Sequence, residues 1–134
     1  MIDIENDIFS YVKSAVQAEL SGCDVSGEYT EVPASFPAVT LVEADNRVLI
    51  RMRTEDIENA ASVMWECNVY SNKAAGKKSE AKAIANIVDA AFASIGFTRT
   101  FREQVPNLRD STIYRIVCQY EAVIDKNYTI YQSE

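Results

Sequence analysis

Hydrophobic residues recur with the period of an α-helix in two separate parts of the chain. The first stripe consists of Ile4, Ile8, Val12, Val16 and Leu20. It predicts a helix over residues 4–20, with Asp3 as the residue that caps its start. Gly22 follows the last apolar position, and we expect it to take the left-handed geometry that ends many helices.

The second stripe lies between residues 81 and 95. It consists of Ala81, Ile84, Ala85, Val88, Ala91, Phe92 and Ile95. This spacing is typical of a helix packed on a sheet, and Gly96 stands where such a helix would close. Ser79 is a candidate for the cap of its first turn.

Other segments alternate between apolar and polar residues with the period of a β-strand. In residues 61–70, one face carries Val63, Trp65, Cys67 and Val69, and the other carries Met64, Glu66, Asn68 and Tyr70. In residues 111–125, one face carries Tyr114, Ile116, Cys118, Tyr120, Ala122 and Ile124, and the other carries Ile113, Arg115, Val117, Gln119, Glu121 and Val123. We expect a further strand in residues 96–104, a turn through Pro106 and Asn107, and an edge strand in residues 128–132.

The region between the first helix and residue 61 is less regular. Residues 25–36 are polar and precede Pro37, which predicts an irregular or edge segment. From Ala38 the chain reads AVTLVEA, and Asp45–Asn46 supplies a turn signal before RVLIRMR, so we expect a hairpin at this point. TEDIENA interrupts the apolar pattern and is interpreted as a solvent loop.

These elements define an α+β protein with the order α-β-β-β-α-β-β. Short connections favour a mostly antiparallel sheet, and both helices are expected on one face of it, as two layers. Residues 1–134 fit one domain, long enough to bury about two thirds of the unfolded surface. On the opposite face, we expect Met64, Tyr70, Ile113 and Val117 to be semi-exposed apolar groups, which often mark a partner surface.

Composition excludes several classes of protein. The apolar fraction of 48% and charged fraction of 25% are typical of globular proteins, and no apolar run approaches the roughly 20 residues of a membrane helix. The acidic amino terminus does not resemble a signal peptide, so we expect a cytoplasmic location. The net charge of -7 disfavours sequence-specific nucleic acid binding.

Positive charge is concentrated near the start of the second predicted helix. Lys73, Lys77, Lys78 and Lys82 lie there within ten residues. One interpretation is a solvated turn that tolerates its charges, although cations at a helix amino terminus oppose the helix dipole. The other is an electropositive patch that docks on a carboxylate-rich surface, such as a neighbouring copy of this acidic protein.

Catalytic and metal-binding patterns do not stand out in the sequence. The chain has no histidine, and its cysteines (Cys23, Cys67 and Cys118) are far apart, which favours small hydrophobic roles over redox or zinc chemistry. The adjacent Glu55 and Asp56, like Glu103, are interpreted as structural or solvated carboxylates. The Gly76-Lys77-Lys78-Ser79 segment lacks the earlier glycine of a phosphate loop. We therefore expect no enzymatic activity, no cofactor and no metal.

Several segments together resemble a known protein family. They are FPAVTLVEADNRV, ENAASVMWECNVYSNKAAGKKSEAKAI, IVDAAFASIGF and PNLRDSTIYRIVCQYEAVID, and they cover most of the chain. This set is similar to small proteins from the head-to-tail joining region of long-tailed bacteriophages and prophages, described as minor capsid, tail completion or tail terminator proteins. The resemblance implies an α+β subunit that forms a ring, usually a hexamer, which caps the tail tube and receives the neck of the head.

The resemblance also implies partners and a location. The partners would be further copies of the chain, the tail tube protein and the neck or connector protein, with assembly in the host cytoplasm and a final place in the virion. DNA would only pass through the ring, and the acidic majority of the surface would keep it from adhering. The candidate interface residues are Lys73, Lys77, Lys78, Lys82, Tyr70 and Met64. One alternative is a head-completion or connector-stopper protein of the neck. The other is a small-ligand-binding or enzymatic α+β domain.

Overall fold

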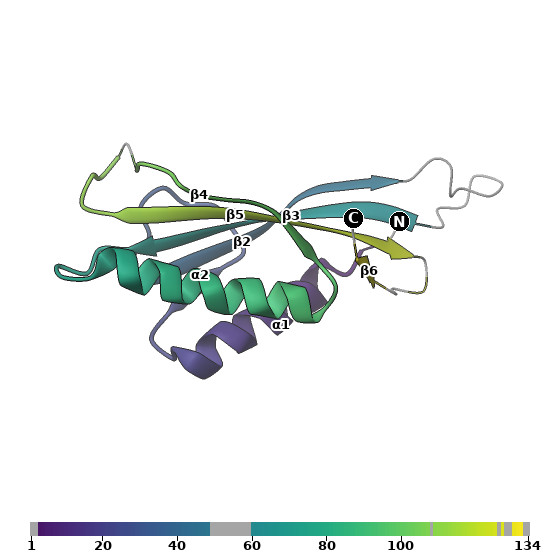
Figure 1. The fold of residues 1–134 in the computed structure, drawn as a ribbon, viewed down its shortest axis with the longest axis horizontal. Coiled ribbons are helices and arrows are strands. Elements are labelled where there is room, and N and C mark those ends of the chain that lie inside the picture. Colours follow the sequence, from purple (N-terminus) through teal and green to yellow (C-terminus); the bar gives the residue numbers. More distant parts are fainter. Residues whose placement is uncertain (1–2, 49–59, 108, 126, 128–129, 133–134) are drawn as a thin grey trace.

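The computed structural model describes residues 3–48, 60–107, 109–125, 127 and 130–132. The elements in chain order are α1 (Glu5–Glu19), β1 (Asp24–Ser26), β2 (Ala38–Val48), β3 (Ala60–Ser71), α2 (Lys77–Ser94), β4 (Thr98–Gln104), β5 (Tyr114–Asp125) and β6 (Ile130–Gln132). This order confirms the predicted α+β class and adds the expected edge strand at its end. The helices lie together beside the sheet, as Figure 1 shows.

The strands form one six-stranded sheet with the order β1-β2-β3-β5-β4. Among the described strands, only β1 runs parallel to its neighbour β2; the pairs β2–β3, β3–β5, β4–β5 and β5–β6 are antiparallel. β4 and β6 share one edge of β5, because β4 pairs with residues 116–121 and β6 pairs with residues 122–124. The prediction of a mostly antiparallel sheet is therefore confirmed.

The hairpin predicted at Asp45–Asn46 is wrong. β2 runs straight through these residues, and Asp45 lies opposite Met64 in β3. The pairing shifts register between Glu43 and Asp45, so that the strand accommodates an extra residue as a bulge instead of turning back. Pairing along the whole length of β3 outweighs the local turn preference of the Asp-Asn pair. The predicted loop in residues 54–60 lies almost wholly outside the described residues.

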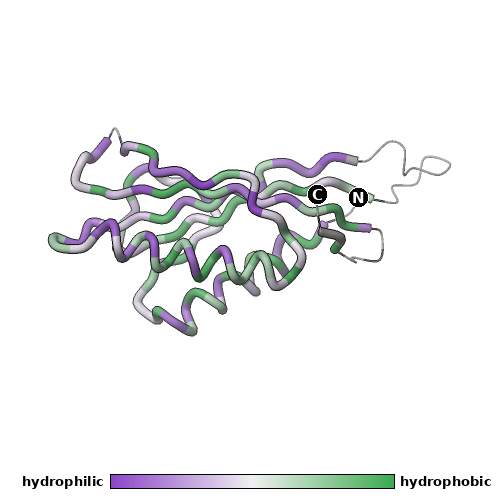
Figure 2. Tube along the Cα trace, viewed as in Figure 1, coloured by the Kyte–Doolittle hydropathy of each residue, from purple (hydrophilic) through white to green (hydrophobic). Residues whose placement is uncertain are grey.

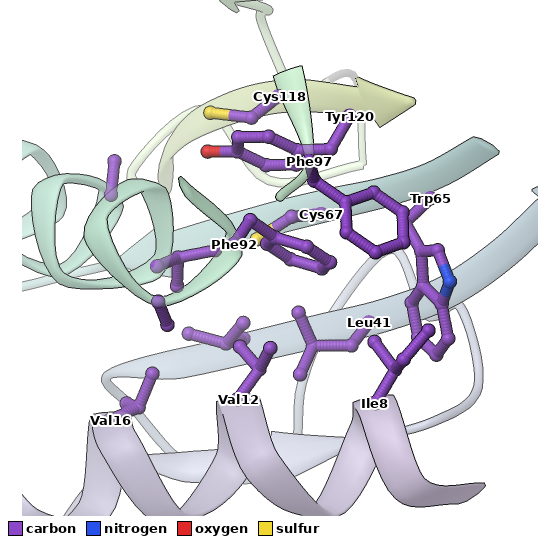
Figure 3. Packing of buried hydrophobic residues seen from close by; sticks show 14 of the residues in the cluster. Ile8, Val12, Val16, Leu41, Trp65, Cys67, Phe92, Phe97, Cys118 and Tyr120 are labelled. Carbon is purple, nitrogen blue, oxygen red and sulfur yellow. The ribbon is translucent and has the colours of Figure 1, made fainter. Parts of the chain in front are cut away.

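Both helices pack on the same face of the sheet and enclose the hydrophobic core. Figure 2 shows hydrophobic and hydrophilic residues alternating along helices and strands, as expected for elements buried on one side. The ring of Phe92 stacks on Tyr120 at a centroid distance of 4.4 Å and meets Phe97 edge-on at 5.3 Å. Trp65 lies beside this aromatic group, and Ile8 of α1 approaches from below in the view of Figure 3.

The ends of α1 differ from the prediction in detail. The helix begins at Glu5, and its cap position is Ile4, which makes no side-chain cap bond. Asp3 still contributes at the start, because its carboxylate accepts a hydrogen bond from the Glu5 N–H at 3.1 Å. Gly22 does not adopt left-handed geometry; the chain leaves the helix at Leu20 and turns through the next two residues.

The ends of α2 are set by two glycines with positive φ. Gly76, at φ 93°, is the cap residue, and Ser79 lies inside the helix and does not cap it. The loop already turns at Gly76, so the helix begins three residues earlier than the serine suggests. Gly96, at φ 94°, follows the last turn and confirms the predicted closure.

Candidate functional site

The four predicted lysines lie together at the start of α2, and we call them the lysine patch. Lys73, Lys78 and Lys82 are exposed, whereas Lys77 is half-buried and donates a hydrogen bond from Nζ to the Thr112 carbonyl at 3.2 Å. The three exposed lysines make no ion pair with any described carboxylate. In Figure 1 this end of α2 forms one tip of the molecule's long axis.

A short hydrogen-bond network holds the loop that carries the lysine patch. Ser71 donates from its hydroxyl to the Glu80 carboxylate at 2.7 Å and accepts from the Lys73 N–H at 3.4 Å. Glu80 is the acidic residue of the first turn of α2, and its N–H donates to the Gly76 carbonyl at 2.9 Å. The lysine patch is therefore presented from a fixed loop, beside the positive end of the helix dipole.

The sheet face opposite the helices is covered at the end near the lysine patch, which corrects the expected semi-exposure. Tyr70 has 0% of its surface exposed, and Ile113 and Val117 have 4% and 5%. Phe36 packs against the small cluster that contains Tyr70 and Ile113. Met64 is partly exposed on this face. Tyr70 thus offers no surface to a partner in this conformation.

Long-range contacts explain why residues 30–36 lie over this face. The Tyr70 hydroxyl donates to the Thr30 carbonyl at 2.5 Å, and its burial raises the pKa of Tyr70 to about 12. The Asn107 side-chain amide donates to the Glu31 carbonyl at 2.6 Å. Polar groups of the covering segment are therefore satisfied by residues that are distant in the sequence.

A groove of about 470 Å³ opens at the start of α1, and we call it the acidic groove. Its lining residues are Glu5, Asn6, Phe9, Ser26, Gly27, Glu28, Leu41 and Trp65. Leu41 and Trp65 are both 1% exposed and form the base, whereas Glu5 and Glu28 are exposed at the rim. The Trp65 indole N–H has no acceptor among the described residues, and Figure 3 shows it on the ring edge turned away from the aromatic cluster.

Three carboxylates crowd together beside the acidic groove. Oxygen atoms of Asp3, Glu5 and Glu43 lie within 4.8 Å of one another. Glu43 lies directly opposite Trp65 in the β2–β3 register, so both side chains are on the helix-covered face. Burial raises the pKa of Glu43, and the negative charges of Glu5 and Asp3 raise it further. The groove therefore favours a cationic occupant.

One positive charge already lies near this groove. Lys13 Nζ is 5.8 Å from the centroid of the Phe9 ring, a distance at which the ring attracts a cation. Asp3, Glu5, Glu28 and Glu43 outnumber this ammonium group, so the local charge stays negative.

Sequence reasoning identified the lysine patch but missed the acidic groove. The available signal was Glu43, which follows Val39 and Leu41 at two-residue spacing and so occupies a position on the apolar face of its strand. An acidic residue on the apolar face of a strand indicates either the end of the hydrophobic core or a functional site. Glu103, another carboxylate considered, is exposed on β4, and Glu55 and Asp56 lie outside the described residues.

The three cysteines are free and buried, as expected for small hydrophobic side chains. Cys67 and Cys118 lie directly opposite each other in β3 and β5. Burial raises the pKa of both thiols, and it raises the pKa of Cys23 to about 11. The reactive thiolate form is therefore suppressed at all three positions.

The fold defines a class of two-layer α+β proteins with two helices on one face of a mostly antiparallel sheet. Within that class the chain is similar to a chain in the solved structure "Virion of native gene transfer agent (GTA) particle". The match covers 87% of this chain and 93% of the other, with a TM-score of 0.62 and 18% sequence identity. At this identity the likeness shows a shared fold.

Two other comparisons are negative: no protein-family model and no curated protein sequence matches the chain. Among the described residues, neither helix has the length and apolar character needed to cross a lipid bilayer.

Proposed function

We propose that this protein is a structural virion component that forms a ring on the tail tube of a long-tailed phage or prophage particle and joins it to the neck. The observation that carries the proposal is the nearly full-length likeness to a chain of a virion structure. The resemblance of four sequence segments to tail terminator proteins supports the same function from an independent direction.

The distribution of charge supports assembly from identical copies. A ring requires a heterologous contact, in which one surface of a subunit meets a different surface of the next. The chain carries a lysine patch in a field with net charge -7, which is the kind of asymmetry that such a contact uses. The further partners would be the tail tube protein and the neck protein.

The proposed role involves no chemical turnover, cofactor or metal. DNA would pass through the ring, and like charge would limit adhesion of its phosphates to an acidic lumen. Assembly would take place in the host cytoplasm, and the final location would be the tail–neck junction of the virion.

Electron microscopy of particles from a deletion phage tests this proposal. Loss of a tail terminator is expected to give abnormally long tails, because nothing stops the growth of the tube. Normal isolated tails beside leaky heads would instead assign the chain to a head-completion or connector-stopper station. Normal particles from the deletion would contradict a structural role in the virion. Re-expression of the chain in the deletion host provides the control.

A further inference from the structure

We propose that the acidic groove of one copy receives the lysine patch of the next copy, and that this contact joins neighbouring subunits. The inference rests on the proposed function insofar as it assumes an assembly of identical chains. It adds the two surfaces that meet, neither of which follows from the fold alone.

Each of the two surfaces is electrostatically unfavourable by itself. Asp3, Glu5 and Glu43 hold three carboxylates within 4.8 Å, and their mutual repulsion contributes to the raised pKa of Glu43. Lys73 and Lys78 flank the start of a helix, where the dipole disfavours cations, and neither pairs with a described carboxylate. Contact between the two surfaces would relieve both repulsions.

The chemistry of the groove suits a lysine-bearing loop. A lysine side chain combines an apolar stem with a charged end, and the acidic groove offers Phe9, Leu41 and Trp65 below a rim with Glu5 and Glu28. The indole N–H of Trp65, a side chain that lines the groove, has no acceptor among the described residues, and a loop brings backbone carbonyls along with its lysines. A peptide loop therefore suits the groove better than a bare ion.

The two surfaces lie in different halves of the molecule. In Figure 1 the start of α2 lies at one tip of the long axis, and the first turn of α1 lies in the other half of the molecule. The two surfaces therefore have the head-to-tail placement that a heterologous contact between copies requires.

Charge reversal with complementary mixing tests the contact. The patch variant is Lys73→Glu with Lys78→Glu, and the groove variant is Glu5→Lys with Glu28→Lys; all four side chains are exposed, so folding should be preserved. In low salt, each variant alone is expected to lose about tenfold or more in association constant by sedimentation, because like charges then face each other. A mixture of the two variants in equal amounts is expected to regain association, because every contact again joins opposite charges.

A matched control separates this effect from a change in net charge. Glu19→Lys with Glu103→Lys reverses two exposed carboxylates outside the groove and changes the net charge by the same amount as the groove variant. This control is expected to associate as the unchanged chain does. An equal loss in the control, or a mixture that stays dissociated, overturns the proposed contact.

Zero-length cross-linking identifies the contact directly. A carbodiimide joins a lysine amine to a carboxylate as an amide, and an equal mixture of isotopically light and heavy protein shows by mass spectrometry which links connect two copies. The expected links join the lysine patch to Glu5, Glu28 or Glu43. Links between copies at other residues only would overturn the docking surfaces and leave the ring intact.

The remaining outcomes distinguish the contact from the proposed function. Recovery in the mixture, together with normal particles from the deletion phage, would support the contact and contradict the tail role. A chain that stays monomeric at high concentration and low salt, alone and on isolated tails, overturns both. Calcium or magnesium binding that the groove variant loses, with association unchanged, would assign the carboxylates to a metal ion and overturn the contact.

Discussion

Substitution of Tyr70 tests whether residues 30–36 are fixed over the sheet face opposite the helices. Tyr70→Phe keeps the ring and removes the hydroxyl that donates to the Thr30 carbonyl at 2.5 Å. Because Thr30 is only half-buried, water can replace the lost donor. We expect the free energy of unfolding to fall by about 1 kcal/mol, the usual net value of one such bond.

Tyr70→Ala removes the ring as well and leaves a cavity between Ala38, Ile113 and Phe36. The expected loss is about 3–5 kcal/mol, the range for truncating a large buried aromatic side chain. A tyrosine on a semi-exposed surface, as the sequence pattern alone suggests, would cost less than about 0.5 kcal/mol. The losses expected for a buried and for a semi-exposed Tyr70 therefore differ by several kcal/mol.

Urea unfolding of the two variants measures these losses, and an unchanged dependence on urea concentration shows that the same surface unfolds. Tyr29→Phe is the matched control, because Tyr29 is 47% exposed, and we expect a change within about 0.5 kcal/mol. Hydrogen exchange in residues 30–36 should accelerate in Tyr70→Ala. A loss below about 1 kcal/mol in Tyr70→Ala, with exchange unaltered, would refute the described covering of this face.

Three further predictions concern the acidic groove, a helix end and the thiols. Glu43→Gln should raise stability near neutral pH, because the raised pKa makes ionisation of Glu43 more costly in the folded chain; the gain should vanish as pH falls below the ordinary value of 4.5, measured by pH-dependent urea unfolding. Gly96→Ala should lower the free energy of unfolding by about 1–2 kcal/mol, because φ is +94° and the new Cβ would lie 3.2 Å from the Cγ2 methyl group of Ile130 in β6. Gly22→Ala, in open space without left-handed geometry, is its control, and should change stability by less than about 1 kcal/mol in the same assay. Cys67 and Cys118 should react with a thiol reagent only at the rate of unfolding, and rapid modification of the folded chain would contradict their burial.

The parts of the fold that the sequence predicted depend on local periodicity. The stripe from Ala81 to Phe92 faces the core as expected, and so do the faces of β3 and β5 that carry Trp65 and Tyr120. The turn at Asp45–Asn46 was wrong because strand pairing, a long-range effect, overrides a two-residue preference. The covering of Tyr70 by Thr30 joins residues 40 positions apart, and no local pattern contains that information.

The same distinction applies to the candidate site. The lysine patch was visible because its members are close together in the sequence. The acidic groove was not, because it combines the first turn of α1 with Glu28 after β1 and with Glu43 and Trp65 from two paired strands. Only the fold brings these residues together, and a cluster of like charges becomes recognisable when the distances between its members are known.

The outer strand β4 is poorly suited to pair with the sheet of another molecule. Its pairing with β5 is interrupted by a bulge between Arg99 and Phe101, in a segment rich in charged side chains. Irregular and charged borders are poor templates for further strands from other molecules. Main-chain addition at this border, which allows many sheet proteins to grow into fibres of unlimited length, is thereby obstructed.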